Sequence, residues 1–383
     1  MSTNNFTCPI CGNTDIYSIG YLNGKPYCRR CISFRGEEVE HKPSYPKKAP
    51  IHLEYGLSTE QKELSEKLVE NYKKGIDSLV YAVCGSGKTE IVLSLISLVV
   101  SCGGNVGFVI PRRDVVIEIQ ERLQSIFKEN LVIGVYGDHS EEKEGDIICL
   151  TSHQLCRYKN YFDLLIIDEI DAFPFKGNDV LEAMFKSSLR GHYVKMSATP
   201  SNEDIDYFKN EGRDILKLFK RYHGDYLPVP IVKKRNNFFA FFELFRLLKK
   251  YKKQNKPVFI FCPTIKLAEK IYDITKLFFS SVKCVHSKKE DRAQIISSFI
   301  KGEFKFLITT SVLERGVTVK DLQVIVMYSD HTLYNEYVLV QIAGRVGRKI
   351  GATKGDVIFI CEEENQQITN CINKIKTANE SLR

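Results

Sequence analysis

The stretch SLVYAVCGSGKTEIVLSLI, residues 78–96, decides the fold class of this chain. It begins as an apolar run, passes through a turn with two glycines, and continues from Lys88 into a second apolar run. The order strand, glycine loop and helix is that of a phosphate-binding P-loop, G-x-x-x-x-G-K-[ST], although Ala82 stands where the first glycine is expected. The stretch predicts a nucleotide-binding α/β domain.

The residues of this loop have the chemistry that a nucleoside triphosphate requires. Gly85 and Gly87 let backbone N–H groups curl around phosphate oxygens, and the helix N-terminus adds partial positive charge. Lys88 is predicted to reach the β- and γ-phosphates, and Thr89 to offer its hydroxyl to Mg²⁺.

A second apolar run, in LLIIDEIDAFPF (residues 164–175), ends in three acids: Asp168, Glu169 and Asp171. Carboxylates resist burial unless they are paired or bind a cation, so a buried strand should stop here with the acids at its carboxyl end. That edge of an open α/β sheet is where ligands bind. We expect Asp168 to hold the Mg²⁺ of Mg-ATP with Thr89, and Glu169 to orient or deprotonate the attacking water.

Four cysteines near the N-terminus, Cys8, Cys11, Cys28 and Cys31, form two C-x-x-C pairs. Their spacing lies within the range of zinc ribbons, in which four thiolates surround one Zn²⁺. A segment this short buries little core, so a metal is a plausible source of its stability. Redox pairs or unrelated cysteines are the alternative. The polar, proline-containing residues 36–50 read as a linker.

Composition sets broad limits. The 383 residues suffice for two or three domains, and the net charge of +8 gives only weak support for a polyanionic partner. No apolar run reaches the roughly 18 residues of a membrane span, and the N-terminus lacks the form of a signal peptide. We therefore expect an intracellular, cytoplasmic protein.

The motifs along the chain resemble superfamily-2 helicases and translocases. AVCGSGKT and DEID are followed in order by MSATP (Ser197 to Thr199), FIFCPT, TTSVLERGVTV (from Thr309) and QIAGRVGR (from Gln341). The resemblance implies two RecA-like parallel-sheet lobes after a small four-cysteine module. We place the module and linker at 1–50, lobe 1 at 51–224 and lobe 2 at 225–383.

A closer resemblance is to the ComFA family of competence ATPases. It rests on the cysteine ribbon ahead of the motor, on DEIDAFPF, and on RYHGDYLPVP at residues 221–230. It implies an ATP-driven motor that helps to pull single-stranded DNA into the cell. The implied partners are single-stranded DNA, other competence proteins (a ComFC-like partner and a membrane DNA channel) and a second copy in a homo-oligomer. The implied location is the inner face of the cell membrane.

Family roles carry over to matching residues. Gln61 resembles the glutamine that reads adenine, although Ser58 and Gln61 also fit a capping box. Ser197 and Thr199 are expected to hydrogen-bond Asp171. Further nucleotide contacts and groups around the γ-phosphate are implied at Ser86, Glu90, Gly316, Gln341, Arg345 and Arg348.

Arg345 and Arg348 lie three residues apart, so we expect them to share a helical face and to act as arginine fingers from lobe 2. Family motifs also suggest nucleic-acid contacts that position a strand without reading its sequence. These contacts are predicted at Arg112, Thr151, His153, Thr264 and Thr310. In LLKKYKKQNKP we expect Leu247, Leu248 and Tyr251 to be buried and the lysines to be only solvated.

Three other functions stay open. A duplex-unwinding helicase of the PriA type also combines cysteine ribbons with such a motor, although no large extra DNA-binding domain fits in this chain. An RNA-remodelling ATPase uses the same phosphate contacts. A non-catalytic ATP-binding scaffold would need neither Lys88 nor Glu169.

Overall fold

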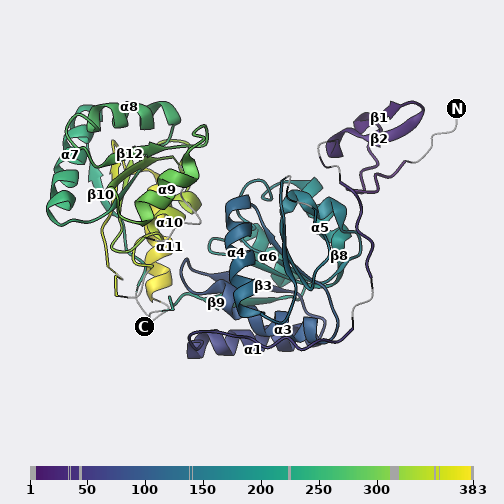
Figure 1. Cartoon of the computed structure of the whole chain (residues 1–383). Coiled ribbons are helices and arrows are strands. Elements are labelled where there is room, and N and C mark those ends of the chain that lie inside the picture. The colour runs from purple at the N-terminus through teal and green to yellow at the C-terminus, as the bar shows by residue number, and fades with distance from the viewer. Residues whose placement is uncertain are drawn as a thin grey trace. The chain divides into compact units, whose positions relative to one another are not determined.

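Two parallel β-sheets organise the chain, one in each of two units. The computed structural model describes residues 6–32, 34, 36–42, 45–137, 139, 141–222, 226–310, 319–348, 351–352 and 354–380. Unit 1 comprises residues 1–82 and 87–218, and unit 2 comprises residues 83–86 and 219–383 (Figure 1). The predicted fold class, two parallel-sheet lobes after a four-cysteine module, is confirmed.

The sheet of unit 1 has the strand order β5-β6-β4-β7-β8-β3-β9, and all its pairs are parallel. Its central strands are buried on both faces, which is why they read as continuous apolar runs. The strands are β3 (Ser78–Ala82), β4 (Val106–Ile110), β5 (Val132–Val135), β6 (Ile147–Thr151), β7 (Phe162–Ile167), β8 (Leu189–Ser197) and β9 (Asp214–Leu218).

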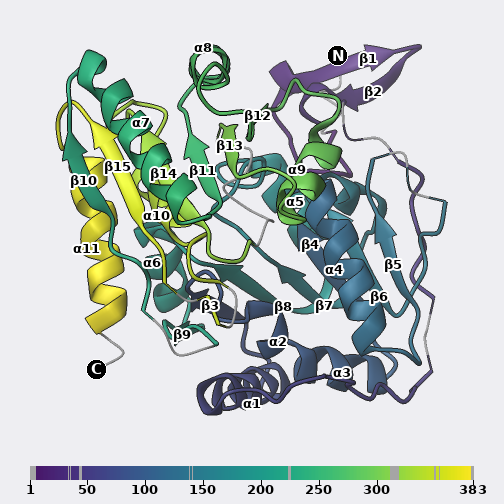
Figure 2. The same cartoon turned by 60° about the vertical axis from the view of Figure 1, so that its left-hand side comes forward.

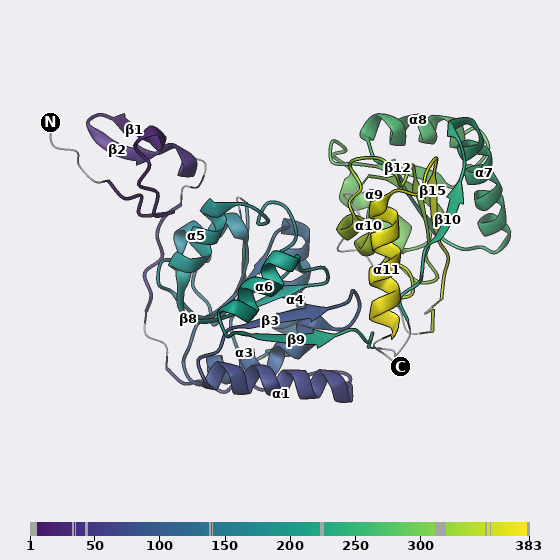
Figure 3. The same ribbon diagram turned by 180° about the vertical axis from the view of Figure 1, so that it is seen from behind.

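Helices cover both faces of this sheet. One face packs against α1 (Thr59–Lys73), α2 (Lys88–Ile91), α3 (Leu93–Ser101) and α4 (Arg113–Ile126) (Figure 2). The other face packs against η3 (Ser152–Arg157), α5 (Asp179–Ser188) and α6 (Asn202–Asn210), seen from behind in Figure 3. The apolar stripes of these helices therefore build two cores around one sheet.

The N-terminal module contains η1 (Ile16–Ser18), the antiparallel hairpin of β1 (Ile19–Leu22) and β2 (Lys25–Cys28), and η2 (Arg29–Cys31). Beyond it, Phe34 stacks on His153 with ring centroids 5.4 Å apart, and Val39 pairs with Tyr158 in a β-bridge. The segment after the module therefore packs on the second face of the unit 1 sheet.

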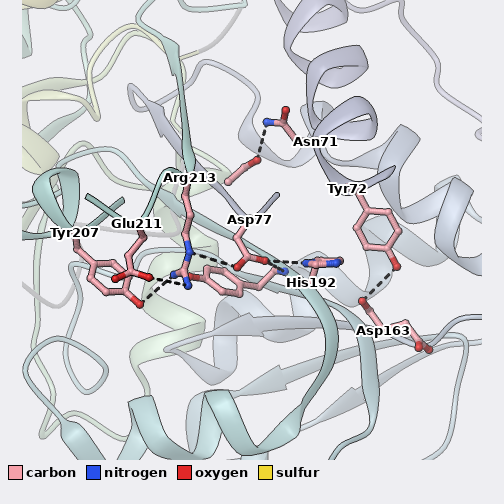
Figure 4. Close-up of polar contacts among 10 residues, drawn as sticks. Asn71, Tyr72, Asp77, Asp163, His192, Tyr207, Glu211 and Arg213 are labelled. Atoms are coloured by element: carbon pink, nitrogen blue, oxygen red, sulfur yellow. Dashed lines mark hydrogen bonds and ion pairs between the residues drawn. The ribbon is translucent and has the colours of Figure 1, made fainter. Parts of the chain in front are cut away.

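A polar network ties together the amino ends of β3, β8 and β9 (Figure 4). Asp77 lies between two bases: its Oδ2 is 3.6 Å from Arg213 Nε, and its Oδ1 is 3.3 Å from His192 Nδ1. Asn71 of α1 donates to Ser78 at 3.0 Å and to Asp214 at 2.9 Å. These bonds anchor the edge opposite to the one that carries the P-loop.

The sheet of unit 2 has the order β10-β15-β14-β11-β13-β12 and is also entirely parallel. β11, β13, β14 and β15 are buried along their whole length. The strands are β10 (Ile231–Lys234), β11 (Val258–Phe261), β12 (Val282–Val285), β13 (Phe306–Thr309), β14 (Gln323–Met327) and β15 (Val357–Cys361).

Helices α7 (Asn237–Lys253) and α8 (Ile265–Thr275) cover one face of this sheet. The other face is covered by α9 (Arg292–Ile300), α10 (Glu336–Ala343) and α11 (Gln366–Glu380). The predicted buried stripe of Leu247, Leu248 and Tyr251 on α7 is confirmed. Within the part of the chain that the structure describes, no helix combines the length and the apolar character that crossing a bilayer requires.

Candidate nucleotide site and nucleic-acid contacts

The P-loop follows β3 as predicted. Gly85 and Gly87 both take left-handed backbone conformations, with φ of 83° and 79°, which glycine adopts without steric cost. Gly87 is the N-cap of α2, and a Cβ at this position would collide with the amide of Gln61. The sequence therefore needs glycine here both for its φ angle and for the close approach of α1.

Lys88 and Asp168 face each other at the carboxyl edge of the unit 1 sheet. Lys88 Nζ lies 3.6 Å from Asp168 Oδ1, and both side chains are largely buried. Burial raises the pKa of the Asp168 carboxyl, and the ammonium of Lys88 opposes that rise. The pair places a cation and a Mg²⁺-type ligand side by side, where a triphosphate and its metal would bind.

Glu169 adopts a φ of 59°, a left-handed conformation that few residues other than glycine take. Its backbone N–H donates to Asp168 Oδ1 at 2.8 Å. Such strain concentrates at functional sites, where the surrounding structure fixes it. Here it turns the chain sharply between the two acids.

The third acid is fully bonded. Ser197 Oγ donates to Asp171 Oδ1 at 2.7 Å, and Thr199 Oγ1 donates to Asp171 Oδ2 at 2.8 Å. Thr199 N–H in turn donates to Ser197 Oγ at 2.9 Å. The predicted bonds from these two hydroxyls to Asp171 are confirmed, and they join the acid motif to the end of β8.

Gln61 makes the capping box that was one of its two interpretations. Its Oε1 accepts from Ser58 N–H at 2.9 Å, and its own N–H donates to Ser58 Oγ at 3.2 Å. Its amide nitrogen lies towards Gly87. The capping box engages the oxygen of the Gln61 amide. Whether the amide also reads adenine is not tested by the structure, so that role stays a prediction.

Glu90, a predicted nucleotide contact, is buried and accepts from Tyr55 Oη at 3.1 Å. It also forms an ion pair with Arg122 of α4. Neither partner belongs to a motif, so the sequence offered no signal for them. The structure thus ties the first turn after the P-loop to α4.

In unit 2 the motif QIAGRVGR begins in α10, but the helix ends at Ala343. The expectation that Arg345 and Arg348 share a helical face is wrong, because Gly344 to Gly347 form a turn in which Gly347 has a φ of 72°. Arg345 is buried, Arg348 is half-buried, and Arg348 Nε donates to the Gly344 carbonyl at 2.9 Å. We call residues 344–348 the glycine–arginine turn. Its finger role stays a prediction.

Arg221 is a residue that the sequence analysis missed. The residue is 1% exposed, and its guanidinium donates to three carbonyls of the glycine–arginine turn: Val346 at 2.7 Å, Gly347 at 2.8 Å and Gly344 at 3.2 Å. The only signal was its place at the start of RYHGDYLPVP, a stretch used for the family resemblance alone. Arg221 holds the backbone between the two predicted fingers.

The predicted nucleic-acid residues gather at the carboxyl edges of the two sheets. In unit 1, Arg112 follows β4 and Thr151 ends the neighbouring strand β6, with His153 just beyond it. In unit 2, Thr264 follows β11, and Thr310 follows the neighbouring β13. Thr264 also caps α8 by accepting from Leu267 N–H at 3.2 Å.

Ser86 of the P-loop and Gln341 of α10 are both buried. Gly316 lies outside the described residues. The structure contains neither a nucleotide nor a nucleic-acid strand against which to test these residues. Their predicted contacts with both ligands therefore stay predictions.

The four N-terminal cysteines converge. Their sulfur atoms lie within 4.8 Å of one another, with Cys8 to Cys31 at 3.8 Å and Cys11 to Cys28 at 3.9 Å. Zn–S bonds of about 2.3 Å in a tetrahedron give sulfur–sulfur distances of about 3.8 Å. Gly12, with a φ of 66°, closes the first knuckle by donating to the Cys8 carbonyl at 2.8 Å. The donor set and its spacing fit a structural zinc ion.

Comparison with known families agrees with this geometry. The family described as "Type III restriction enzyme, res subunit" matches residues 54–202, and "Helicase conserved C-terminal domain" matches residues 241–350. Such domains imply ATP with Mg²⁺ as the ligand of the P-loop.

Solved structures show the same fold at low sequence identity. Dbp5 of S. cerevisiae bound to RNA and ADP BeF3 has a TM-score of 0.62 at 17% identity, covering 84% of this chain and 92% of that chain. The DUF1998 helicase MrfA bound to DNA has a TM-score of 0.57 at 14% identity, covering 87% of this chain and 52% of that chain.

Two curated relatives match almost the whole chain. "Competence protein ComFA" of Streptococcus pneumoniae is 32% identical over 97% of this chain and 90% of the relative. "Competence protein ComFA" of Bacillus subtilis is 31% identical over 98% of this chain and 86% of the relative. With the P-loop, the acid motif and both helicase domains in place, the chain belongs to the ComFA family of helicase-like ATPases of competence.

Proposed function

We propose that this chain is an ATP-driven motor that moves along single-stranded DNA and drives the import of transforming DNA during competence. The observation that carries the proposal is the Lys88–Asp168 pair next to the Asp171–Ser197–Thr199 network. One end of this arrangement is suited to a triphosphate. The other end lies at the sheet edge where Arg112 follows β4 and Thr151 ends β6.

The reaction is assigned to residues of the P-loop, the acid motif and the glycine–arginine turn. Lys88 would turn from Asp168 to the β- and γ-phosphates of bound ATP. Asp168 and Thr89 would hold the Mg²⁺, which would neutralise charge on the phosphates. Glu169 orients the attacking water and accepts its proton. Arg345 and Arg348 stabilise the charge that develops as the γ-phosphoryl group leaves.

Coupling to DNA runs through Asp171. Movement of Asp168 or Glu169 during hydrolysis shifts Asp171, and Ser197 and Thr199 pass that shift to the end of β8. Arg112, Thr151 and His153 in unit 1, with Thr264 and Thr310 in unit 2, grip the sugar-phosphate backbone without reading sequence. Alternating grips would advance the strand towards the cytoplasm, beside a membrane channel and other competence proteins.

The test is the ATPase rate against added polymer: none, single-stranded DNA, duplex DNA or RNA, with Glu169→Gln as the control. We expect single-stranded DNA to give the strongest stimulation, falling with salt, and the variant to abolish it. Preferential stimulation by RNA would assign the chain to RNA remodelling. Absence of hydrolysis in every mixture would favour a scaffold and contradict the motor.

We also propose that the four cysteines hold one structural zinc ion. Cys8→Ser with Cys11→Ser is expected to reduce bound zinc from one atom per chain to none and to loosen the module, while part of the ATPase activity remains. Metal analysis and limited proteolysis measure both effects. The matched control is Cys102→Ser with Cys156→Ser, which removes two thiols outside the cluster and should leave zinc unchanged. A wild-type protein without zinc would refute the assignment.

A further inference from the structure

A single aromatic ring beside the acid motif is turned out to solvent. Phe173 is 88% exposed, and among the residues that the structure describes no large apolar side chain is more exposed. Its neighbours in the chain, Ala172 and Pro174, are buried, and so is Phe175. An isolated exposed phenylalanine is ordinary on a protein surface. The place of this ring and the way its backbone is held therefore decide whether it has a role.

The backbone around Phe173 is tied to the acid motif. We call residues 172–178 the phenylalanine loop. Ala172 N–H donates to the Glu169 carbonyl at 2.8 Å, and the preceding residue, Asp171, accepts from the two hydroxyls described above. Phe173 thus lies two residues from an acid that is bonded to the end of β8. A shift of that acid has to move the start of the loop.

The far side of the phenylalanine loop is anchored in the core. Phe175 packs edge to face on Phe185 of α5, with ring centroids 6.1 Å apart. Phe175 N–H and Lys176 N–H both donate to the Ala172 carbonyl at 3.0 Å, which closes the backbone into a turn. Because the loop is held at both ends, its exposed ring is already in place, and a ligand that stacks on it need not order the loop.

The phenylalanine loop lies at the sheet edge that carries the predicted nucleic-acid contacts of unit 1. It follows β7, next to β4, which precedes Arg112, and then β6, which ends at Thr151. At about 4.8 Å per strand, β4 and β6 lie about 5 and 10 Å from β7. The loop leads into α5, which packs on the same sheet face as η3, the helix that contains His153. The P-loop helix α2 packs on the opposite face.

The predicted strand contacts at this edge lack a free π face. Arg112 and Thr151 offer a cation and a hydroxyl, which suit phosphates, and the ring of His153 is already stacked on Phe34. Proteins that hold a single strand without reading its sequence combine phosphate contacts with aromatic side chains, because every base can stack on a ring. Phe173 has the chemistry and the exposure for that second contact.

We propose that Phe173 stacks on a base of the bound single strand and that the phenylalanine loop links this contact to Asp171. The inference rests on the proposed function, because it requires a single strand at this edge. It adds a residue that grips a base, where the other predicted contacts grip the backbone. It also gives the acid motif a direct connection to the strand through two peptide units.

The first test uses the absence of tryptophan from the chain. Phe173→Trp places one indole on the phenylalanine loop, and a base stacked on it should quench its fluorescence. We expect quenching by single-stranded DNA and none by a sugar-phosphate strand of the same length without bases, which offers no ring to stack. The matched control is Phe238→Trp on α7 of unit 2, where the native side chain is 68% exposed and no strand contact is assigned. Equal quenching of both variants, or quenching by the base-free strand, would overturn the proposal.

The second test measures the contribution of the ring to strand binding. Phe173→Leu keeps an apolar side chain and removes the π face, so the single-stranded DNA concentration at half-maximal ATPase stimulation should rise about fivefold or more. Phe173→Tyr should restore the wild-type concentration, and Phe238→Leu should not change it. Because residue 173 is exposed, all three variants should unfold at the wild-type denaturant concentration. Equal half-maximal concentrations for the wild type and Phe173→Leu would contradict the stacking contact.

The link to the acid motif has its own measurement. The DNA concentration that quenches half of the Phe173→Trp fluorescence should differ at least about fivefold between a nonhydrolysable ATP analogue and ADP. Adding Asp171→Asn should reduce that difference, because it weakens the bonds that tie the loop to β8. An undiminished difference would show that Asp171 does not connect the ring to the nucleotide state.

Failure of this inference and failure of the motor give different results. Stimulation of the wild-type ATPase by single-stranded DNA, with an unquenched Phe173→Trp variant, would refute the stacking contact and leave the motor in place. Quenching by single-stranded DNA in a protein that hydrolyses no ATP would refute the motor and leave the stacking contact. Neither quenching nor stimulation would refute both.

Discussion

The acid motif of unit 1 and the glycine–arginine turn of unit 2 are held by different means. Asp171 accepts hydrogen bonds from two side chains, Ser197 and Thr199, which belong to another recognisable motif. The turn is held through its backbone by Arg221, which lies more than 120 residues away in sequence, in a stretch to which the sequence analysis gave no role in the site. Predicted catalytic groups can therefore be visible in a sequence while the residue that positions them is not.

The largest effect is expected for Arg221→Met, which keeps much of the side-chain volume and removes every donor. Three carbonyls of the turn then lose a buried charged partner, at about 1–3 kcal/mol for each unsatisfied group. We expect the free energy of unfolding to fall by about 3 kcal/mol or more and turnover to fall at least about tenfold, because the backbone that carries Arg345 and Arg348 is released.

Denaturant unfolding and steady-state ATPase assays measure these effects. Arg246→Met is the matched control: its side chain is 61% exposed, so its ion pair with Glu243 is worth about 1 kcal/mol at most. If the two arginine variants behaved alike, Arg221 would not be what holds the turn.

A smaller effect is expected for Asp171→Asn. The amide keeps one acceptor and presents N–H groups to the second hydroxyl, which should cost about 1–2 kcal/mol. If Asp171 links the acid motif to β8, stimulation by single-stranded DNA should fall more than the basal rate. A double-mutant cycle with Ser197→Ala should give a coupling of about 1 kcal/mol. Purely additive effects would show that this bond does not couple the two motifs.

The smallest effect concerns the ion pair of α7. Hydrogen bonding to Arg246 lowers the pKa of Glu243. A carboxyl with a lowered folded-state pKa adds stability above its unfolded pKa, and this is lost as pH falls through the folded value. Glu243→Gln should therefore lower the free energy of unfolding by about 1 kcal/mol or less at neutral pH. The difference should shrink as pH falls below about 4 and vanish below the folded-state pKa. A difference in free energy of unfolding between the wild type and the variant that grew towards acid pH would contradict this prediction.

The sequence predicted those parts of the site whose residues are consecutive in the chain. Lys88 follows a glycine loop after a buried strand, and Asp168 ends another, so the parallel sheet had to bring both to one edge. The sequence-based prediction failed where contacts between residues far apart in the chain determine the local structure. α10 ends at Ala343 and is followed by a turn in which Gly347 has a left-handed conformation. The buried position of Arg221 depends on three carbonyls that no side-chain pattern reveals.

Gln61 shows an intermediate case. The capping box was readable from Ser58 and Gln61, yet the closeness of its amide to Gly87 depends on how α1 packs beside the P-loop. Similarly, the aromatic residues of α7 were visible in the sequence, but only the structure shows that Phe238, Phe239 and Phe242 lie outside the core.

The most direct test of the motor is displacement of streptavidin from biotin at one end of single-stranded DNA. We expect ATP-dependent displacement from one end only, and no displacement by Glu169→Gln. In Asp171→Asn, displacement should fall more than ATP hydrolysis does. DNA-stimulated hydrolysis by the wild type without displacement from either end would contradict the claim that this ATPase moves along the strand.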